Sequence, residues 1–323
     1  MCVLLVSLCL VVSLALTGCS QSKLPVVGVI PKGASHQFWQ TVHAGAIQAG
    51  REYGLDIEWN APTLEIDAAR QIDIVQSMVT RKLAGIAIAP VDRKALVAVL
   101  ERATATGIPV AVFDSDLDSP HRIAYVATDN REGGRMAARR IGTILAGRGK
   151  VLIVGFMPGS ASTMEREEGF IEEIKRAYPG IVLLETQFGM ANRAKALAVT
   201  ENMLSAHPDL AGIFADNESS SSGAVQALKS RANRTAKLVA FDASAQLIDD
   251  LKQAWIDSLV VQDPFRMGYE SVKAIGEKRK GGTVQARLDL PAKLIQAGDL
   301  NQPSVKELLF PNLDRWLKTD NPH

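Results

Sequence analysis

The chain has very little cysteine, and what it has is confined to one end. Only three of its 323 residues are cysteines, Cys2, Cys9 and Cys19, and the sequence after position 19 contains none. The body of the chain therefore excludes disulfide bonds, thiol catalysis and cysteine-ligated zinc. It must be held together by its hydrophobic core alone, for which a hydrophobic content of 47% is ample.

An excess of one charge is also lacking. Lys and Arg total 36 against 35 for Asp and Glu, which gives a formal net charge of +1. Proteins that bind mainly the phosphate backbone of nucleic acid normally carry a basic excess, so we expect no nucleic-acid partner. Aromatic residues make up only 5% of the chain, which draws attention to the adjacent pair Phe38 and Trp39.

One long apolar run is present, over residues 2–16, but it is shorter than the roughly 20 residues of a membrane-spanning helix. A short apolar segment followed by small residues predicts a secretory signal peptide, which we place over residues 1–19. Its end, Leu-Thr-Gly-Cys, is similar to the bacterial lipobox, which implies a lipid on Cys19 and a membrane tether. The usual basic residues before the run are missing, because the first is Lys23. An ordinary signal peptide with an incidental cysteine is the alternative.

Beyond Leu24, short runs of Val, Ile and Leu alternate with longer segments of helical periodicity. Most of the short runs lack polar alternation, which is typical of strands covered on both faces in a parallel sheet. The predicted strands are residues 26–30, 55–59, 85–89, 109–113, 123–126, 150–155, 181–186, 212–215, 238–241 and 258–261.

Helices are predicted between these strands. Apolar residues recur at helical spacing over residues 72–83 and again over residues 197–204. The second of these helices should end at His207-Pro208, because proline cannot continue a helix. The run Ser219–Ser222 resembles a linker, but we expect it to open a helix, where serines cap well.

Repeated strand–helix–strand units predict a doubly wound α/β fold with parallel sheets. Ten strands are too many for one compact sheet, so we expect two similar lobes joined by several crossings of the chain. The first break is expected near residues 128–130, and later crossings near Asp263 and Leu290. The expected parts are residues 24–128 with 263–290, residues 129–262 with 291–310, and a C-terminal tail over residues 311–323.

Ligands of such folds sit at the carboxyl ends of the strands. The residues that follow the predicted strands are rich in acids and amides, and Arg166 is available from the second lobe. Carboxylates and amides bind neighbouring hydroxyls, arginine spans two oxygens, and an aromatic face covers the C–H side of a sugar ring. This set therefore suits a neutral, polyhydroxylated ligand.

At this point the chain resembles bacterial periplasmic sugar-binding proteins of the ribose/galactose type, the solute receptors of ABC importers. The stretches that carry the resemblance are residues 29–39, 113–116, 166–170, 206–209, 214–218 and 239–242. It implies the type I periplasmic binding protein fold, two lobes closing over a monosaccharide, and a membrane permease as partner. It also implies a monomer in the periplasm or at the cell surface.

The resemblance assigns roles to particular residues. Phe38 and Trp39 match the aromatic pair that packs on the sugar, and Arg166 matches an arginine that clamps ring hydroxyls. The matching polar contacts are Asp114, Asn217, Asp242 and Gln262.

The chain also departs from ribose binders. His36 stands where they have asparagine, Ser115 where they have arginine, and Ala191 where they have a third aromatic residue. The fine specificity is therefore not expected to be that of ribose. Lys32, His36 and Asp116 are added as candidate ligand contacts.

A second resemblance offers an alternative ligand. Residues 30–32, 114–116 and 186–189 are similar to receptors for the furanosyl signal autoinducer-2. In those receptors a lysine after the first strand and an aspartate after the fourth help to hold the ligand. Autoinducer-2 or a related furanose is therefore the alternative to a monosaccharide.

Each candidate also has an ordinary structural interpretation. Phe38 and Trp39 would serve equally as core residues at the start of a helix. Asp114 would serve to cap a turn, since aspartate after a strand is common. Arg166 would pair with a glutamate on its own helix surface.

Catalytic and metal-binding patterns are missing from the sequence. It has no G-x-S-x-G nucleophile motif, no G-x-x-x-x-G-K-S/T phosphate loop and no HExxH pair. Residues 114–118 open like a calcium loop, but Ser119 replaces the required glycine and Tyr125 the bidentate glutamate. We therefore expect a binding protein rather than an enzyme, without cofactor or metal.

A receptor that passes its signal to a membrane kinase is an alternative role. A sugar-responsive transcription factor would need a helix-turn-helix where the apolar leader stands.

Overall fold

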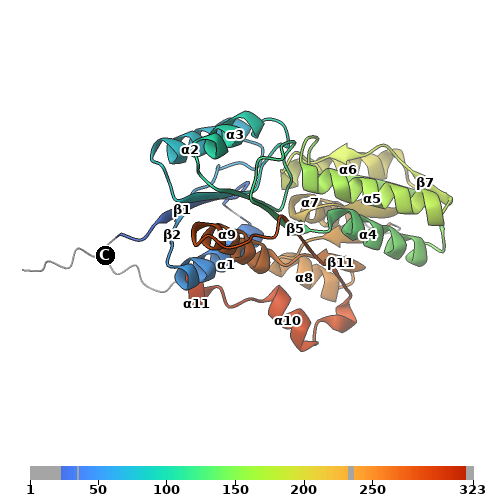
Figure 1. Cartoon of the computed structure of the whole chain (residues 1–323). Helices are drawn as coiled ribbons and strands as arrows, with labels where there is room; N and C mark the ends of the chain where they lie inside the picture. Colours follow the sequence, from blue (N-terminus) through green and yellow to red (C-terminus); the bar gives the residue numbers. More distant parts are fainter. Residues whose placement is uncertain (1–22, 35, 232–235, 318–323) are drawn as a thin grey trace, which may run out of the picture.

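The computed structural model describes residues 23–34, 36–231 and 236–317, which form two α/β lobes lying side by side (Figure 1). The predicted signal peptide and Cys19 lie outside the described residues. Within the described part of the chain, no helix combines the length and apolar character needed to cross a membrane. The predicted fold class, two doubly wound lobes with parallel sheets, is confirmed.

The first lobe is built on a six-stranded, all-parallel sheet in the order β12-β5-β4-β3-β1-β2. One face packs against α1 (Gln37–Tyr53) and α9 (Pro264–Arg279), and the other against α2 (Ala68–Thr80) and α3 (Val97–Ala105). Its strands are β1 (Val26–Ile30), β2 (Asp56–Trp59), β3 (Gly85–Ile88), β4 (Val110–Phe113), β5 (Ala124–Thr128) and β12 (Arg287–Leu290).

The second lobe repeats this plan in the order β13-β11-β10-β9-β6-β7, with β8 (Gln187–Phe188) beside β6 and β13 antiparallel to β11. One face packs against α4 (Asn130–Ile144) and α5 (Ala161–Ala177). The other packs against α6 (Arg193–Ala206), α7 (Glu218–Lys229) and α8 (Ala245–Lys252). Its other strands are β6 (Arg148–Gly155), β7 (Gly180–Leu183), β9 (Leu210–Ala215), β10 (Lys237–Phe241), β11 (Ser258–Val261) and β13 (Lys293–Ile295).

All ten predicted strands are present, with ends that differ by at most three residues. The two helices predicted from periodicity are α2 and α6, and α6 ends at Ala206, directly before His207-Pro208. Three strands were missed: β8 has only two residues, and β12 and β13 are short strands of alternating or mixed polarity at sheet ends. Such segments carry too weak a periodic signal to be recognised in isolation.

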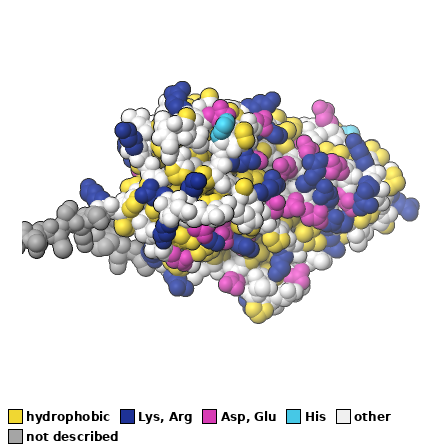
Figure 2. Space-filling view, in the orientation of Figure 1, with side chains coloured by type: hydrophobic (Ala, Val, Ile, Leu, Met, Phe, Trp, Pro, Cys, Tyr) yellow, Lys and Arg dark blue, Asp and Glu magenta, His cyan; other side chains and the backbone are white. Residues whose placement is uncertain are grey.

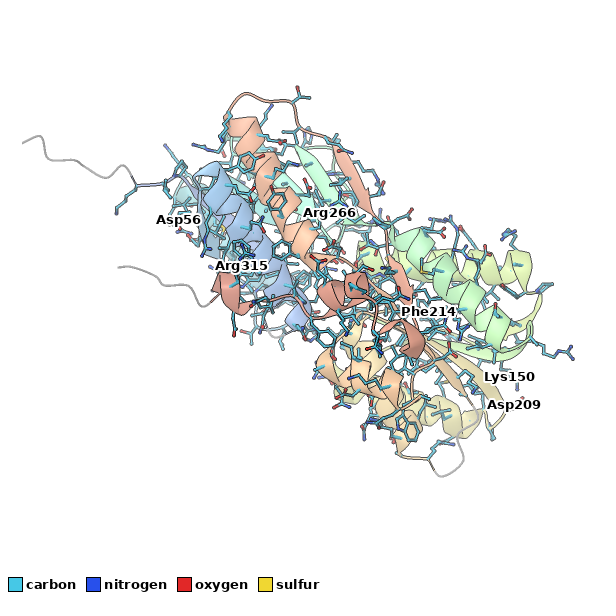
Figure 3. All side chains as sticks on the ribbon, turned by 90° about the horizontal axis from the view of Figure 1, so that it is seen from below. Asp56, Lys150, Asp209, Phe214, Arg266 and Arg315 are labelled. Carbon is cyan, nitrogen blue, oxygen red and sulfur yellow. The ribbon has the colours of Figure 1, made fainter. Side chains whose placement is uncertain are left out.

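The chain passes between the two sheets at three places, after β5, after β11 and after β12. It then forms a short 3₁₀ turn, Ala297–Asp299, and α10 (Pro303–Leu309), which packs on the core of the second lobe. The last described helix, α11 (Asp314–Leu317), returns to the first lobe and lies against α1 (Figure 1). Figure 3 shows the molecule from below, with Arg315 of α11 labelled on the first lobe.

Charges of both signs are mixed on the surface. Figure 2 shows acidic and basic side chains interspersed over the face formed by α4 and α5. Arg131 pairs there with Glu168 at 2.9 Å and also with Glu172, bridging the two helices. Another pair, Lys150 with Asp209 at 2.9 Å, lies at the far end of the second lobe (Figure 3). The face shown in Figure 2 therefore has no large patch of only acidic or only basic side chains.

The same close helix crossing occurs in both lobes. A Cβ at Gly45 of α1 would lie 1.9 Å from the carbonyl oxygen of Phe265 in α9, and one at Gly268 would lie 2.0 Å from that of Val42. Helices α4 and α5 meet in the same way, because a Cβ at Gly169 would lie 2.0 Å from the carbonyl oxygen of Arg131. Each lobe therefore requires glycine where its paired helices cross.

Replacing Gly45 or Gly169 with alanine should lower the free energy of unfolding by about 1–3 kcal/mol, because the new methyl group forces two packed helices apart. Urea unfolding of the purified variants measures this change. Gly298→Ala is the matched control, since a Cβ there meets no atom within 4 Å. Equal unfolding midpoints for Gly45→Ala, Gly169→Ala and Gly298→Ala would contradict the packing argument.

Candidate functional site

A cavity lies between the carboxyl ends of the two sheets, with walls from both lobes. Nine of the ten candidate ligand residues line it: Lys32, His36, Phe38, Trp39, Asp114, Arg166, Asn217, Asp242 and Gln262.

Two aspartates occupy equivalent places in the two lobes. Asp114 directly follows β4 and Asp242 directly follows β10, and both backbones are left-handed, with φ of 61° and 69°. Each N–H donates to the neighbouring strand, that of Asp114 to the carbonyl of Val126 and that of Asp242 to the carbonyl of Val260. Aspartate tolerates this conformation better than most residues. The turn therefore ends each strand and places a carboxylate in the cavity wall.

Lys32, after β1, is buried beside Asp114. Its ammonium lies 2.8 Å from Oδ2 of Asp114 and donates to the hydroxyl of Ser115 at 2.7 Å. It also donates across the lobes to Ser160 and Ser162, both at 3.2 Å. Ser115 donates to the hydroxyl of Ser162 at 2.7 Å. Lys32 therefore compensates the charge of Asp114 and ties the two lobes together at this side of the cavity.

Arg166, on α5, is only 2% exposed and is fixed by three contacts. Its Nε donates to Oδ1 of Asn130 at 2.8 Å, and its Nη1 donates to the carbonyl oxygen of Asp216 at 2.9 Å. The guanidinium carbon lies 3.9 Å from the centre of the Phe241 ring. These contacts set the plane in which Arg166 faces the cavity, so it does not sit as a surface ion pair on its own helix.

Gln262 connects the site to one of the crossings. It lies between β11 and α9, and its amide donates to Oδ1 of Asp242 at 2.6 Å. Its carbonyl oxygen accepts the hydroxyl of Thr128 at 2.7 Å, and Thr128 is the last residue of β5, where the chain first leaves the first lobe. A carboxylate of the site is therefore held by side chains from two of the three crossings.

Asn217 has a structural task besides lining the cavity. Its side chain accepts the N–H of Ser220 at 3.1 Å and so caps α7. We predicted that Ser219–Ser222 opens a helix, which is correct, but the capping residue is Asn217. Three of these serines are buried in the first turn of α7; Ser220 and Ser221 bond to backbone carbonyls of β6 and β10.

The aromatic residues of the site come from both lobes. Phe38 and Trp39 pack edge to face with ring centres 4.8 Å apart, and Trp39 is also part of the first lobe's core, with an exposed fraction of 4%. Phe156, which is not among the candidates, follows β6 and lines the wall formed by the second lobe. It stands directly after a strand, so the rule that found Asp114 would have found it.

Four further lining residues are not among the candidate ligand residues: Glu65, Ser162, Thr163 and Glu218. Glu65 lies on the connection after β2, and Glu218 is the neighbour of Asn217 at the end of β9, so both follow strands. Ser162 and Thr163 begin α5 and carry no comparable signal.

Asp116 does not line the cavity. Its Oδ1 accepts the N–H of Leu117 at 2.7 Å, and its Oδ2 pairs with Arg122 at 3.1 Å. Asp116 therefore closes a surface turn. The described residues hold no group of three or more His, Cys, Asp or Glu side chains suited to a metal ion.

A buried acidic pair adjoins the site. Asp216 is fully buried, and its Oδ2 accepts the N–H of Phe156 at 3.1 Å. Glu167 of α5 carries the neighbouring carboxyl, and neither Oδ1 of Asp216 nor Oε1 of Glu167 has a hydrogen-bond partner among the described residues. Burial raises the pKa of both carboxyls, and the charge of Asp216 raises the pKa of Glu167 further. The pair therefore shares a proton at pH values where exposed carboxyls are ionised.

This pair should make the protein less stable as pH rises. In the unfolded chain both groups lose their protons near pH 4, whereas in the native state they keep one to higher pH. The native state then binds more protons than the unfolded state, so the free energy of unfolding falls as pH increases above about 4.

Glu167→Gln removes the shared proton, so its melting temperature should fall less than that of the wild type between about pH 5 and about pH 8. Thermal unfolding at a series of pH values measures the two slopes. Glu172→Gln is the control, because Glu172 is exposed on the same helix and pairs with Arg131 at the surface. The same slope in all three proteins would show that the buried pair carries no pH-dependent stability.

With this geometry in hand, comparison with known proteins gives a consistent result. The family described as "Periplasmic binding protein domain" matches residues 27–283. The ribose import binding protein of Bacillus subtilis is 26% identical over 268 residues, which are 83% of this chain and 86% of that protein. The D-ribose/D-allose-binding protein of Pseudomonas aeruginosa is 32% identical over 232 residues, 68% of this chain and 70% of that protein.

Solved structures agree with these relatives. A carbohydrate transporter solute-binding protein from Agrobacterium radiobacter, in complex with D-arabinose, has a TM-score of 0.86 and 30% identity, covering 90% of this chain and 100% of that one. An ABC transporter solute-binding protein from Agrobacterium vitis, bound with α-D-tagatopyranose, has a TM-score of 0.84 and 29% identity, covering 88% and 98%. The expected resemblance is confirmed, and the chain belongs to the periplasmic binding protein family.

Proposed function

We propose that this protein binds a monosaccharide or a related polyol between its lobes and delivers it to the permease of an ABC importer. The observation that carries this proposal is the cavity between the two sheets, lined by carboxylates, amides, one arginine and aromatic rings from both lobes. The comparisons also support the proposal. Relatives of this chain are named for ribose and allose, and similar solved structures hold D-arabinose and tagatose.

The chemistry of each side chain fits a role towards a hydroxylated ring. Asp114 and Asp242 accept hydrogen bonds from hydroxyl groups on opposite sides of the cavity, and Arg166 donates to two adjacent oxygens. The amides of Asn217 and Gln262 add further polar contacts. The remaining proposed contacts are the aromatic rings of Phe38 and Trp39, which cover the apolar face of the ring.

Binding and release follow from the two lobes. A sugar that contacts Asp114 in one lobe and Asp242 in the other favours the closed arrangement, and hinge closure is a common way for such proteins to report occupancy. We propose that the closed form docks on the membrane permease as a monomer, and that the site catalyses no reaction.

A thermal-shift panel of the purified protein against monosaccharides, polyols and autoinducer-2 tests the function. A sugar present at about 100 times its dissociation constant should stabilise the native state by about 2.7 kcal/mol, an easily measured shift. A response to autoinducer-2 alone would replace the sugar with the furanosyl signal. No response to any member of the panel would overturn the proposal.

Two substitutions test the site. Asp242→Ala and Arg166→Ala should each weaken binding of the identified sugar by at least about 100-fold, because each leaves hydroxyl groups and buried partners without a hydrogen bond. Isothermal titration measures the affinities, and circular dichroism checks the fold. Asp249→Asn, on the exposed surface of α8, is the matched control. Wild-type affinity in both alanine variants would remove these residues from the site.

We also propose that the mature protein is tethered to a membrane, in the periplasm or at the cell surface, through a lipid on Cys19. The support is the Leu-Thr-Gly-Cys sequence after the apolar run. Cys19→Ser should move most of the protein from the membrane fraction to the soluble fraction of cells, as seen by immunoblotting. A wild-type distribution of Cys19→Ser would rule out the lipid tether.

A further inference from the structure

One imidazole lies between carboxylates that belong to different lobes. Nδ1 of His36 lies 3.4 Å from Oε1 of Glu65, in the first lobe, and 3.3 Å from Oε2 of Glu218, in the second lobe. His36 directly precedes α1, and all three side chains line the cavity. Their side chains are only 5–14% exposed, so water screens these charges weakly.

The two carboxylates differ in their other partners. Oε1 of Glu65 also accepts the indole N–H of Trp39 at 2.6 Å, which anchors it within the first lobe. Oε1 of Glu218 accepts from Arg193 at 2.6 Å and from Ser222 at 3.1 Å. Oε2 of Glu218 is buried and has no hydrogen-bond partner among the described residues, and it lies 3.3 Å from Nδ1 of His36. Glu218 thus presents to the first lobe a carboxylate oxygen with no other partner.

Closing the lobes brings these two negative groups together around His36. A neutral imidazole offers them at most one shared N–H, whereas an imidazolium also supplies a positive charge between them. The charged form therefore stabilises the closed arrangement more than the neutral form does. In an open arrangement Glu218 moves away with its lobe, and this difference is lost.

We propose that His36 is a positioning residue that clamps the lobes together in its protonated state, so that ligand affinity depends on pH. This inference rests on the proposed function, because it concerns closure around the same ligand. Linkage requires that a proton which favours closure is in turn bound more readily when the ligand closes the lobes. Because histidine changes charge between pH 5 and 8, affinity is highest at the acidic end and falls as pH rises.

Other ionisable groups face the same cavity and bear on the test. Lys32 pairs with Asp114 on one wall, Arg166 lies on another, and burial raises the pKa of Asp242. Arg193 pairs with Glu218 from outside. All of these groups remain in a variant that changes His36 alone. The difference between the pH profiles of the wild type and that variant therefore isolates the clamp.

The test is isothermal titration with D-ribose, D-allose and D-arabinose at several values between about pH 5.5 and about pH 8.5. We expect wild-type affinity to fall by at least about fivefold across this range, and His36→Gln to bind with a flatter profile. Glu218→Gln should flatten the profile too, and adding it to His36→Gln should have no further effect, because both break one contact. His121→Gln, at an exposed position, is the control and should follow the wild type.

The opposite results are equally clear. A wild-type profile in His36→Gln, or effects of His36→Gln and Glu218→Gln that multiply, would overturn the clamp while leaving sugar binding intact. If none of the three sugars binds, the proposed function fails for them, and small-angle scattering of the protein alone tests the clamp. A radius of gyration that is smaller at low pH in the wild type but not in His36→Gln would support it. No difference between the two proteins would overturn it.

Discussion

Closing two lobes over one cavity brings four carboxylates, those of Glu65, Asp114, Glu218 and Asp242, out of bulk water. Burying charge is costly unless it is paired and hydrogen-bonded, and the rest of the site can be understood as a response to that cost. Lys32 compensates Asp114, Arg193 and His36 meet Glu218, and Gln262 holds Asp242. Among these partners His36 lies in the lobe opposite to its carboxylate, Glu218, and Lys32 also donates across the lobes to Ser160 and Ser162, so charge compensation and closure are coupled at these two places.

The repeated architecture explains why such a site arises at all. Each lobe ends an inner strand with a left-handed aspartate, and both sheets direct their carboxyl ends towards the shared cavity. Three crossings of the chain limit how the lobes move, and Gln262 connects two of them to Asp242. The proposed ligand contacts and the crossings of the chain therefore share side chains, which is what the proposed function, a receptor that reports occupancy by closing, requires.

Much of this could be predicted from the sequence, because parallel strands buried on both faces leave continuous apolar runs and their last residues face the ligand. Phe156 directly follows β6 and obeys the same rule, whereas Glu65 lies several residues beyond the end of β2. Asp116 follows a strand as well, yet its turn directs it to Arg122. The contacts between lobes, such as those of Lys32 with Ser160 and Ser162, depend on how two separately folded units meet. The periodicity of the sequence within one lobe carries no information about which residues of the other lobe it will contact.

The contacts of Lys32 also bear on the ligand specificity of the site. Ser115 stands where the resemblance to ribose binders leads one to expect an arginine, and the ammonium of Lys32 reaches the space beside Asp114 instead. The cation beside Asp114 is therefore a compact ammonium, which donates hydrogen bonds to three serine hydroxyls and forms an ion pair with the carboxylate. Among the described residues, Arg166 is then the only guanidinium lining the cavity. Under the proposed function, a ligand would direct a pair of adjacent hydroxyls towards Arg166 in the second lobe, and at Asp114 it would meet an acceptor beside the ammonium of Lys32.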